Sequence, residues 1–337
     1  MAWPSSSSIY AAYAPSNGLG PARIEEVELS TGVTTPLQLT LDPVCIREDF
    51  VEPTRLPNGQ LGFLDHCIHA LSDPEVSTIK TYPGVSGVAK IVANLGTLPS
   101  SRGQFGFNPS MHQVVIGIGN QACNSISIYR DSIVTTPPIQ IVDGGHSFGL
   151  DKVSDGRQDC TGDPIVDWPD WSPDGNTISF VASTDAIGVS GPARLDAMFS
   201  VWALDIKTSV AHRILTGLNH PRSLRWSPMG NSLAFSGELA GQQGTWVMGS
   251  SGGSPQLVSS LEFAWLAWSP DGSQIVGSHV LGPTLSELIT LPVHCVTGPT
   301  LRKISSDPPI AEVDSVSGTW QQRFLGPRPG RQRDLRG

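Results

Sequence analysis

Charged residues are scarce in this sequence of 337 residues, at 15%, and basic residues are fewer than acidic ones, 21 against 30. The formal net charge of −9 argues against a nucleic-acid partner, because phosphate backbones are bound by clusters of Lys and Arg. No apolar run reaches the roughly 18 residues that a membrane-spanning helix needs. With a nucleic-acid partner and a membrane-spanning helix disfavoured, we expect a turn-rich protein that binds a protein or peptide.

Targeting signals are also missing from the sequence. The first residues lack a basic segment followed by an apolar core, so no signal peptide is expected. The chain begins inside a repeat, which is compatible with a mature or trimmed form. In contrast, Gly and Pro are abundant, at 36 and 28 residues, as an all-β chain with many turns requires.

A five-residue unit recurs along the chain. Trp171-Ser-Pro-Asp-Gly175 returns as Trp268-Ser-Pro-Asp-Gly272 and, with Met in place of Asp, as Trp226-Ser-Pro-Met-Gly230. Pro presets the second position of a turn, and Gly takes the left-handed position. Apolar residues precede and follow each copy, so each unit predicts two short strands joined by a β-turn, with the Trp as an apolar plate facing a neighbouring unit.

Weaker copies extend the series in both directions. The turn is kept at Arg55-Leu-Pro-Asn-Gly59 and an aromatic with Pro at Phe107-Asn-Pro109, while Trp3 and Trp320 stand at the two ends. The anchors at 3, 55, 107, 171, 226, 268 and 320 are spaced by 52, 52, 64, 55, 42 and 52 residues. A repeat of about 40 to 50 residues with four strands is typical of a β-propeller.

The repeats carry a resemblance to a known family. The Trp-Ser-Pro-Asp-Gly turn, the apolar strand after it and polar hairpins such as Leu204-Asp205 to Thr208 are similar to the TolB-type six-bladed propeller. The resemblance covers residues 3 to 322. It implies an all-β fold of six four-stranded antiparallel blades, a partner-binding rim and a periplasmic or secreted location, but a structural motif does not assign a function.

The two ends of the chain predict how the ring closes. Residues 313–320 read as an innermost strand, and residues 9–40 as the three strands that would follow it, so Val316–Trp320 is expected to pair with Ile9–Ala14. The alternative is a complete first blade that begins at Trp3. We expect one propeller domain over residues 1–324 and a disordered tail, rich in Pro, Gly and Arg, over 325–337.

Loops that enter each blade should gather on one face, around the central channel. The longest connection, residues 143–171, is acidic, and an acidic rim favours a basic protein or peptide. The predicted rim consists of Asp49, Glu52, Arg102, His146, Asp155, Asp159, Asp163, His220, Glu262, Glu312 and Asp314. A solvated acidic loop is the simpler reading of the long connection, and a cation there is the alternative. No other cofactor is expected.

Cysteines and histidines offer few further sites. The five cysteines form no Cys-x-x-Cys pair, so a zinc ribbon is not expected. Propeller topology would permit the disulfides Cys45–Cys67 and Cys123–Cys160, leaving Cys295, but five free thiols are slightly favoured. His66 and His69 suggest a metal, yet capping of a strand end by Asp65 and His66 is the simpler interpretation.

A nucleophile motif occurs once. Gly145-His146-Ser147-Phe148-Gly149 matches Gly-x-Ser-x-Gly, but that elbow needs a following helix, and residues 150–163 have no helical apolar period. The sequence therefore predicts a non-catalytic binding scaffold. The alternative function is a lyase or hydrolase acting at the channel mouth.

Overall fold

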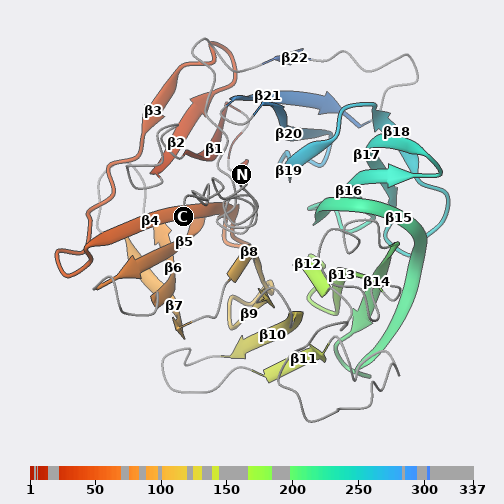
Figure 1. The fold of residues 1–337 in the computed structure, drawn as a ribbon, viewed down its shortest axis with the longest axis horizontal. Coiled ribbons are helices and arrows are strands. Elements are labelled where there is room, and N and C mark those ends of the chain that lie inside the picture. Colours follow the sequence, from red (N-terminus) through yellow and green to blue (C-terminus); the bar gives the residue numbers. More distant parts are fainter. Residues whose placement is uncertain are drawn as a thin grey trace, which may run out of the picture.

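The protein is built from antiparallel β-sheets placed around a centre (Figure 1). The structure, a computed structural model, describes residues 1–3, 5, 7–13, 23–69, 76–82, 89–97, 101–119, 124–130, 139–143, 166–183, 198–282, 285–293 and 302–303. These residues form 22 strands and no helix, so no helix long and apolar enough to cross a membrane is found among them. This confirms the predicted all-β class.

The first part of the chain forms three sheets, each ordered as a simple meander. Their strands are β1 (Ser8–Tyr13), β2 (Arg23–Glu28) and β3 (Thr34–Pro36); β4 (Arg47–Arg55), β5 (Leu61–Ile68), β6 (Val76–Tyr82) and β7 (Lys90–Thr97); and β8 (Ser101–Phe107), β9 (Gln113–Gly119), β10 (Asn124–Arg130) and β11 (Ile139–Asp143).

The second part forms a seven-stranded sheet and a four-stranded sheet. Their strands are β12 (Val166–Trp171), β13 (Thr177–Ser183), β14 (Phe199–Asp205), β15 (Val210–Trp226), β16 (Ser232–Leu239), β17 (Gln242–Gly249) and β18 (Gln256–Ser259); and β19 (Phe263–Trp268), β20 (Gln274–Gly282), β21 (Leu285–Pro292) and β22 (Arg302–Lys303).

Strand β15 explains why one sheet is so long. Its first half pairs with β14, from Val210 with Asp205 onward, and its second half pairs with β16, up to Trp226 with Leu233. The register shifts between Asn219 and Ser223, and His220 has a positive φ of 49° in that interval. One strand therefore serves as the outer edge of one set of strands and the inner edge of the next.

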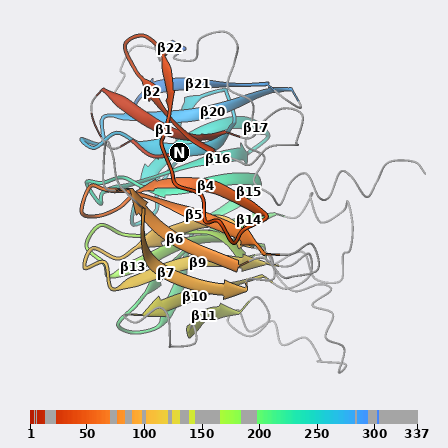
Figure 2. The same ribbon diagram turned by 90° about the vertical axis from the view of Figure 1, so that its left-hand side faces the viewer.

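The innermost strands face the centre of the ring, and the outer strands β3, β7, β11, β18 and β22 lie at its periphery (Figure 1). The side view shows the strands running across the thickness of the ring (Figure 2). Consecutive strands alternate in direction, so the turn after each innermost strand opens on one face, and the connection into the next innermost strand opens on the other.

The core is divided into layers between neighbouring sets of strands. Phe50 and Phe63 of the β4–β7 sheet pack with Ile24 of β2, and Val115 of β9 packs with Trp171 and Phe180. The series continues around the ring, and Ile9 and Val27 of the first sheet pack with Val276 and Leu288 of the last. The β1–β3 sheet therefore packs against the β19–β22 sheet.

The turn after the innermost strand is built the same way in each copy. Gly175 donates to the carbonyl of Ser172 at 2.9 Å, and Gly272 donates to Ser269 at the same distance. The Ser hydroxyls donate to Asp174 and Asp271, at 2.5 and 2.6 Å. Since Gly175, Gly230 and Gly272 have φ values of 72°, 75° and 70°, the turn needs glycine at this place.

The structure bears on two predictions about this framework. The inner edge of β1 at Tyr10 is taken by Ala2, through reciprocal backbone hydrogen bonds of 2.9 and 2.7 Å, which favours the alternative of a first blade beginning near Trp3. Residues 316–320, which we expected there, lie outside the described residues. Trp171 and Trp268 are buried as predicted, but Trp226 is only half-buried, although all three border the same pocket.

Candidate functional site

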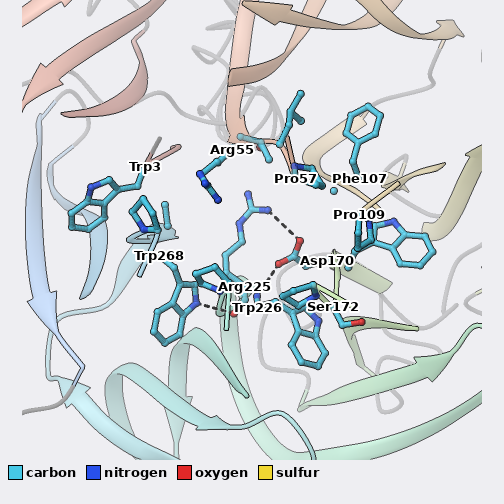
Figure 3. Close-up of a pocket in the computed structure, with 18 of the residues that line it drawn as sticks. Trp3, Arg55, Pro57, Phe107, Pro109, Asp170, Ser172, Arg225, Trp226 and Trp268 are labelled. Atoms are coloured by element: carbon cyan, nitrogen blue, oxygen red, sulfur yellow. Dashed lines mark hydrogen bonds and ion pairs between the residues drawn. The ribbon is translucent and has the colours of Figure 1, made fainter. Parts of the chain in front are cut away.

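A pocket of about 340 Å³ lies where the repeated turns meet at the centre of the ring (Figure 3). Its wall is made of the aromatic and proline side chains of the repeat. These are Trp3, Pro57, Phe107, Pro109, Trp171, Pro173, Trp226, Pro228, Trp268 and Pro270. The repeat that builds the fold therefore also builds an apolar, largely aromatic wall, of the type that holds a ligand by shape.

The charged lining comes from two neighbouring positions of the repeat. In five copies the residue immediately before the anchor lines the pocket together with the anchor. From the second copy onward, this position holds Thr54, Gly106, Asp170, Arg225 and Ala267, and Arg55 lines the pocket from the anchor position itself. The charged side chains of the lining are thus two cations, Arg55 and Arg225, and one anion, Asp170.

Arg225 and Asp170 form the charged pair at the centre of this lining. Arg225 Nη1 lies 3.9 Å from Asp170 Oδ1, and both side chains are at most 15% exposed. The Trp226 amide donates to Asp170 Oδ2 at 2.8 Å. Burial raises the pKa of Asp170 to about 6, although the Arg225 charge and backbone amides oppose the rise. Near pH 7 both groups are therefore ionised, but at 3.9 Å they are too far apart for a hydrogen bond.

Glu52 is the most perturbed carboxyl group behind the pocket. It lies in β4 with a positive φ of 54°, is only 6% exposed, and burial raises its pKa to about 7. The charges of Arg225, His66 and the Met1 ammonium favour its ionised form, while Asp167 opposes it. The Met1 ammonium is itself buried, and its pKa falls to about 5. Glu52 thus belongs to a buried group of mutually interacting titratable side chains that includes the pocket residue Arg225.

Hydrogen bonds between sets of strands hold the pocket in shape. Gln104 of β8 donates to the carbonyls of Pro169 at 3.2 Å and Leu224 at 2.8 Å. Trp268 Nε1 donates to the carbonyl of Arg225 at 3.1 Å. These contacts join residues that are 65, 120 and 43 positions apart, so the pocket is fixed by the ring as a whole.

The predicted rim residues do not assemble into one described cluster. Asp49 and Glu52 lie inside β4 and are buried, at 7% and 6% exposure, whereas we expected them in an exposed loop. They differ from the expectation because β4 begins at Arg47, earlier than the sequence pattern suggested. Asp49 has a partner in this interior.

The other predicted rim residues are distributed as follows. His220 is exposed on β15, and Glu262 is half-buried, accepting from Arg222 Nε at 2.7 Å. Arg102 lies in β8, with no description of its side chain. Outside the described residues lie His146, Asp155, Asp159, Asp163, Glu312 and Asp314, the Gly145–Gly149 motif and the anchor Trp320. The acidic rim remains a prediction.

Sequence reasoning missed Asp170, Arg225 and Arg55 as site residues. Arg55 was considered only as a repeat anchor. Asp170 and Arg225, which precede Trp171 and Trp226, were not considered as candidate site residues. The signal was available, since a position that varies between Arg, Asp, Gly and Ala at a fixed place in a structural repeat indicates a surface or cavity, not a core. The pocket lies at the turns that follow the innermost strands, whereas the rim was predicted in the connections that precede them.

The structure describes two of the five cysteines. A disulfide joins Cys45 and Cys67, whose Cα atoms are 5.4 Å apart, so the permitted pairing is found where free thiols were slightly favoured. Cys123, Cys160 and Cys295 lie outside the described residues. His66 does not cap a strand end, because β5 continues to Ile68, and its Nδ1 lies 2.9 Å from the Ser77 hydroxyl.

Solved structures of similar fold are numerous, although no protein-family model and no curated protein matches the sequence. TolB from Acinetobacter baumannii matches with a TM-score of 0.59 and 11% identity, over 85% of this chain and 61% of that chain. The chain thus spans less than two thirds of that protein. The fold resembles TolB-like propellers, as the sequence predicted.

Other neighbours have different descriptions. A nidogen/laminin complex matches with a TM-score of 0.55 and 8% identity, over 90% of this chain and 95% of that chain. A puromycin-hydrolyzing peptidase of Mycobacterium tuberculosis matches with a TM-score of 0.52 and 12% identity, over 89% of this chain and 46% of that chain. At such identities the likeness shows the propeller fold and no activity.

Proposed function

We propose that the protein is a six-bladed propeller scaffold that binds a segment of a protein partner in the axial pocket. Six blades are supported by two features. Strand β15 divides the seven-stranded sheet into two sets of strands, and the apolar layers follow one another around the ring, back to the first sheet. With Ala2 as the innermost position of the first set, every set then has four strands.

The observation that carries the binding role is the lining of the pocket. Rigid turns supply an aromatic and proline wall, and Arg225 and Arg55 supply donors in its lining. Such a combination suits an inserted apolar or aromatic side chain whose neighbouring carboxylate or carbonyl oxygens accept from the guanidinium groups. The pocket lining carries two cations against one anion, so this face favours an acidic segment although the chain is acidic overall.

The fold comparisons support a scaffold, with the neighbour named as a complex of nidogen and laminin as one example of a propeller in a protein assembly. Enzymes are also present among the neighbours, but this chain corresponds to only 46% of the peptidase. No constellation of nucleophile and base is found among the described residues of the pocket. Binding is therefore the function that requires no residues beyond those that line the pocket.

The experiment is a selection of displayed peptides against the full-length protein, followed by calorimetry with the enriched peptides. Arg55→Gln changes an exposed donor at the pocket, while Arg222→Gln changes an exposed donor near the opposite end of an innermost strand. We expect Arg55→Gln to weaken binding about tenfold, as the loss of a charge-assisted hydrogen bond does, and Arg222→Gln to have no effect. The reverse result would place the binding site on the other face.

A further inference from the structure

The disulfide between Cys45 and Cys67 belongs to a group of three potential metal ligands. One ligand atom each from Cys45, Cys67 and His69 lies within 4.8 Å of the other two. Cys67 is buried, Cys45 is half-buried and His69 is exposed, so the group is reached from the surface. No other group of at least three such side chains is found among the described residues.

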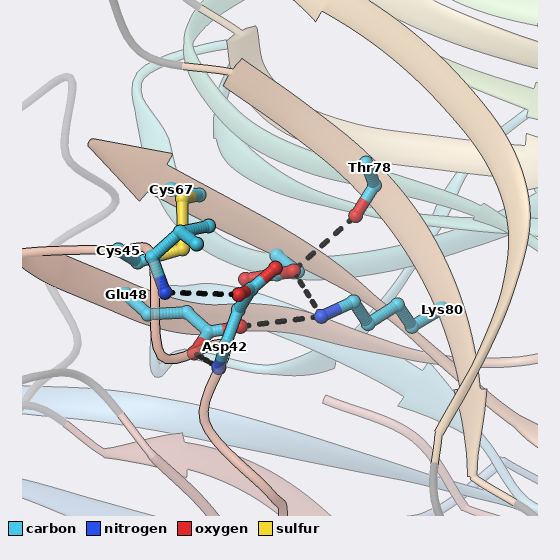
Figure 4. Close-up of a disulfide and its surroundings, with 8 residues drawn as sticks. Asp42, Cys45, Glu48, Cys67, Thr78 and Lys80 are labelled. Carbon is cyan, nitrogen blue, oxygen red and sulfur yellow. Dashed lines mark hydrogen bonds and ion pairs between the residues drawn. A yellow bond between two sulfur atoms is a disulfide. The ribbon is translucent and has the colours of Figure 1, made fainter. Parts of the chain in front are cut away.

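The two sulfur atoms are held near each other by contacts that do not depend on the disulfide (Figure 4). The Cys45 amide donates to the carbonyl of Asp42 at 3.0 Å, and the Asp42 amide donates to Glu48 Oε2 at 2.6 Å. On the other side, the Ile46 amide donates to the carbonyl of Ile68 at 2.8 Å. The loop that carries Cys45 is thus tied to β4 and β5 on both sides of the cysteine.

Glu48, which accepts from the Asp42 amide in this loop, belongs to a buried ionic network. Lys80 Nζ lies 3.2 Å from Glu48 Oε1 and 2.5 Å from Asp65 Oδ2, and Thr78 also donates to Asp65 (Figure 4). The Glu48 and Asp65 side chains are only 2% and 5% exposed. A carboxylate fixed in this way keeps its hold on the Asp42 amide whatever the state of the sulfur atoms.

The distances suit a tetrahedral metal ion once the sulfur–sulfur bond is broken. Zinc binds sulfur at about 2.3 Å and imidazole nitrogen at about 2.0 Å, so neighbouring ligand atoms stand somewhat under 4 Å apart. Small side-chain rotations would separate the two sulfur atoms to that distance. Two thiolates and an imidazole form a ligand set that selects zinc over the hard cations magnesium and calcium.

We infer that the reduced protein binds one zinc ion through Cys45, Cys67 and His69, and that oxidation to the disulfide abolishes this site. Three protein ligands leave the fourth position to a water molecule or a small external ligand. The site lies in β5 and the loop before β4, away from the axial pocket, and is independent of the proposed binding function.

The chemistry balances with a phosphine as reductant. The phosphine takes the oxygen atom of water and becomes a phosphine oxide, while the two electrons and two protons convert the disulfide to two thiols. Zinc then displaces the two thiol protons, which are released to solvent. Because thiols must lose protons to bind, zinc affinity should fall as the pH is lowered.

The test uses the full chain with Cys123, Cys160 and Cys295 replaced by Ser, reduced with a phosphine and freed of metal. Zinc is titrated against a chromophoric chelator, and cobalt is used in parallel for its thiolate charge-transfer absorption. We expect one zinc ion per reduced chain, none per oxidised chain, and cobalt absorption that is lost in Cys67→Ser. If the triple replacement does not fold, the same comparison is made between the wild-type chain and Cys67→Ser.

His69→Gln and His212→Gln are the matched pair of histidine variants, since both histidines are exposed. His69→Gln should weaken zinc binding by more than roughly tenfold, and His212→Gln should leave it unchanged. Equal zinc binding by oxidised and reduced protein, or by His69→Gln and its parent, would overturn the inference. Loss of cooperative unfolding on reduction would also overturn it and leave a purely structural disulfide.

Discussion

Glu52 makes the free energy of unfolding depend on pH. Its folded-state pKa of about 7 lies above the ordinary value of 4.5, so the folded protein holds this proton more tightly than the unfolded chain does. The favourable contribution is complete below about pH 4.5 and is lost as the pH rises toward 7. Each unit of difference corresponds to about 1.4 kcal/mol.

We predict that Glu52→Gln becomes progressively more stable than the wild type as the pH rises from about 4.5 to about 7. Urea unfolding at a series of pH values measures this difference. Asp174→Asn is the control of opposite sign, because its hydrogen bond from Ser172 holds the pKa of Asp174 at about 2. That variant should be less stable than the wild type by a constant amount above about pH 4 and should approach the wild type only as the pH falls toward 2, and a parallel pH dependence of all three proteins would contradict the assignment.

The anchors of the repeat make a second prediction at the scale of residues. Trp171 and Trp268 are 4% and 8% exposed and pack between sheets, so replacing either with Ala should cost about 3–5 kcal/mol of unfolding free energy. Trp226 is half-buried at the pocket, and Trp226→Ala should cost less. Chemical unfolding measures all three, and a cost at Trp226 equal to the others would contradict its half-buried position.

At the scale of elements, turn glycines meet two separate requirements, which Gly272 of the repeated turn and Gly241 of the β16–β17 hairpin distinguish. Gly272 has a φ of 70°, and a Cβ atom placed there would lie 3.0 Å from Met229 and 3.1 Å from Ser227. Gly241 has a φ of 79° and no atom within 4 Å of such a Cβ. The first residue therefore has both a backbone and a packing requirement, and the second has only the backbone requirement.

We predict that Gly241→Ala costs roughly 1–2 kcal/mol, which is the strain of a left-handed backbone, and that Gly272→Ala costs more. Thermal and urea unfolding of the two variants provide the measurement. Equal costs would mean that the contact between neighbouring turns is loose, and that Met229 and Ser227 can move aside.

At the scale of the whole molecule, closure of the ring involves the first residues of the described structure. Trp3 is 3% exposed and packs with Ile9, Ala267 and Val276, while Ala2 occupies the edge of β1. We predict that Trp3→Ala lowers the melting temperature sharply, whereas deletion of residues 311–337 leaves it nearly unchanged. If the deletion instead causes opening and aggregation, residues 316–320 close the ring as the sequence pattern had indicated.

Also at the scale of the whole molecule, the acidic connection gives a prediction about binding partners. If residues 143–171 form a binding wall, replacing Asp155, Asp159 and Asp163 with Asn should weaken association with a basic peptide and reduce its salt dependence. Calorimetry at two ionic strengths measures both effects. Unchanged affinity and unchanged salt dependence would identify these aspartates as a solvated surface.

The sequence by itself determined the repeating turn, the all-β class and the burial of Trp171 and Trp268, because these depend on local turn chemistry and on the alternation of apolar residues. Only the tertiary structure decided the site. Arg55, Asp170 and Arg225 are far apart in the chain and meet because their strands are brought around one axis. The same applies to Glu52, whose pKa near 7 comes from burial by neighbouring strands. Local patterns specify which face a side chain takes, and the closure of the ring specifies what that face meets.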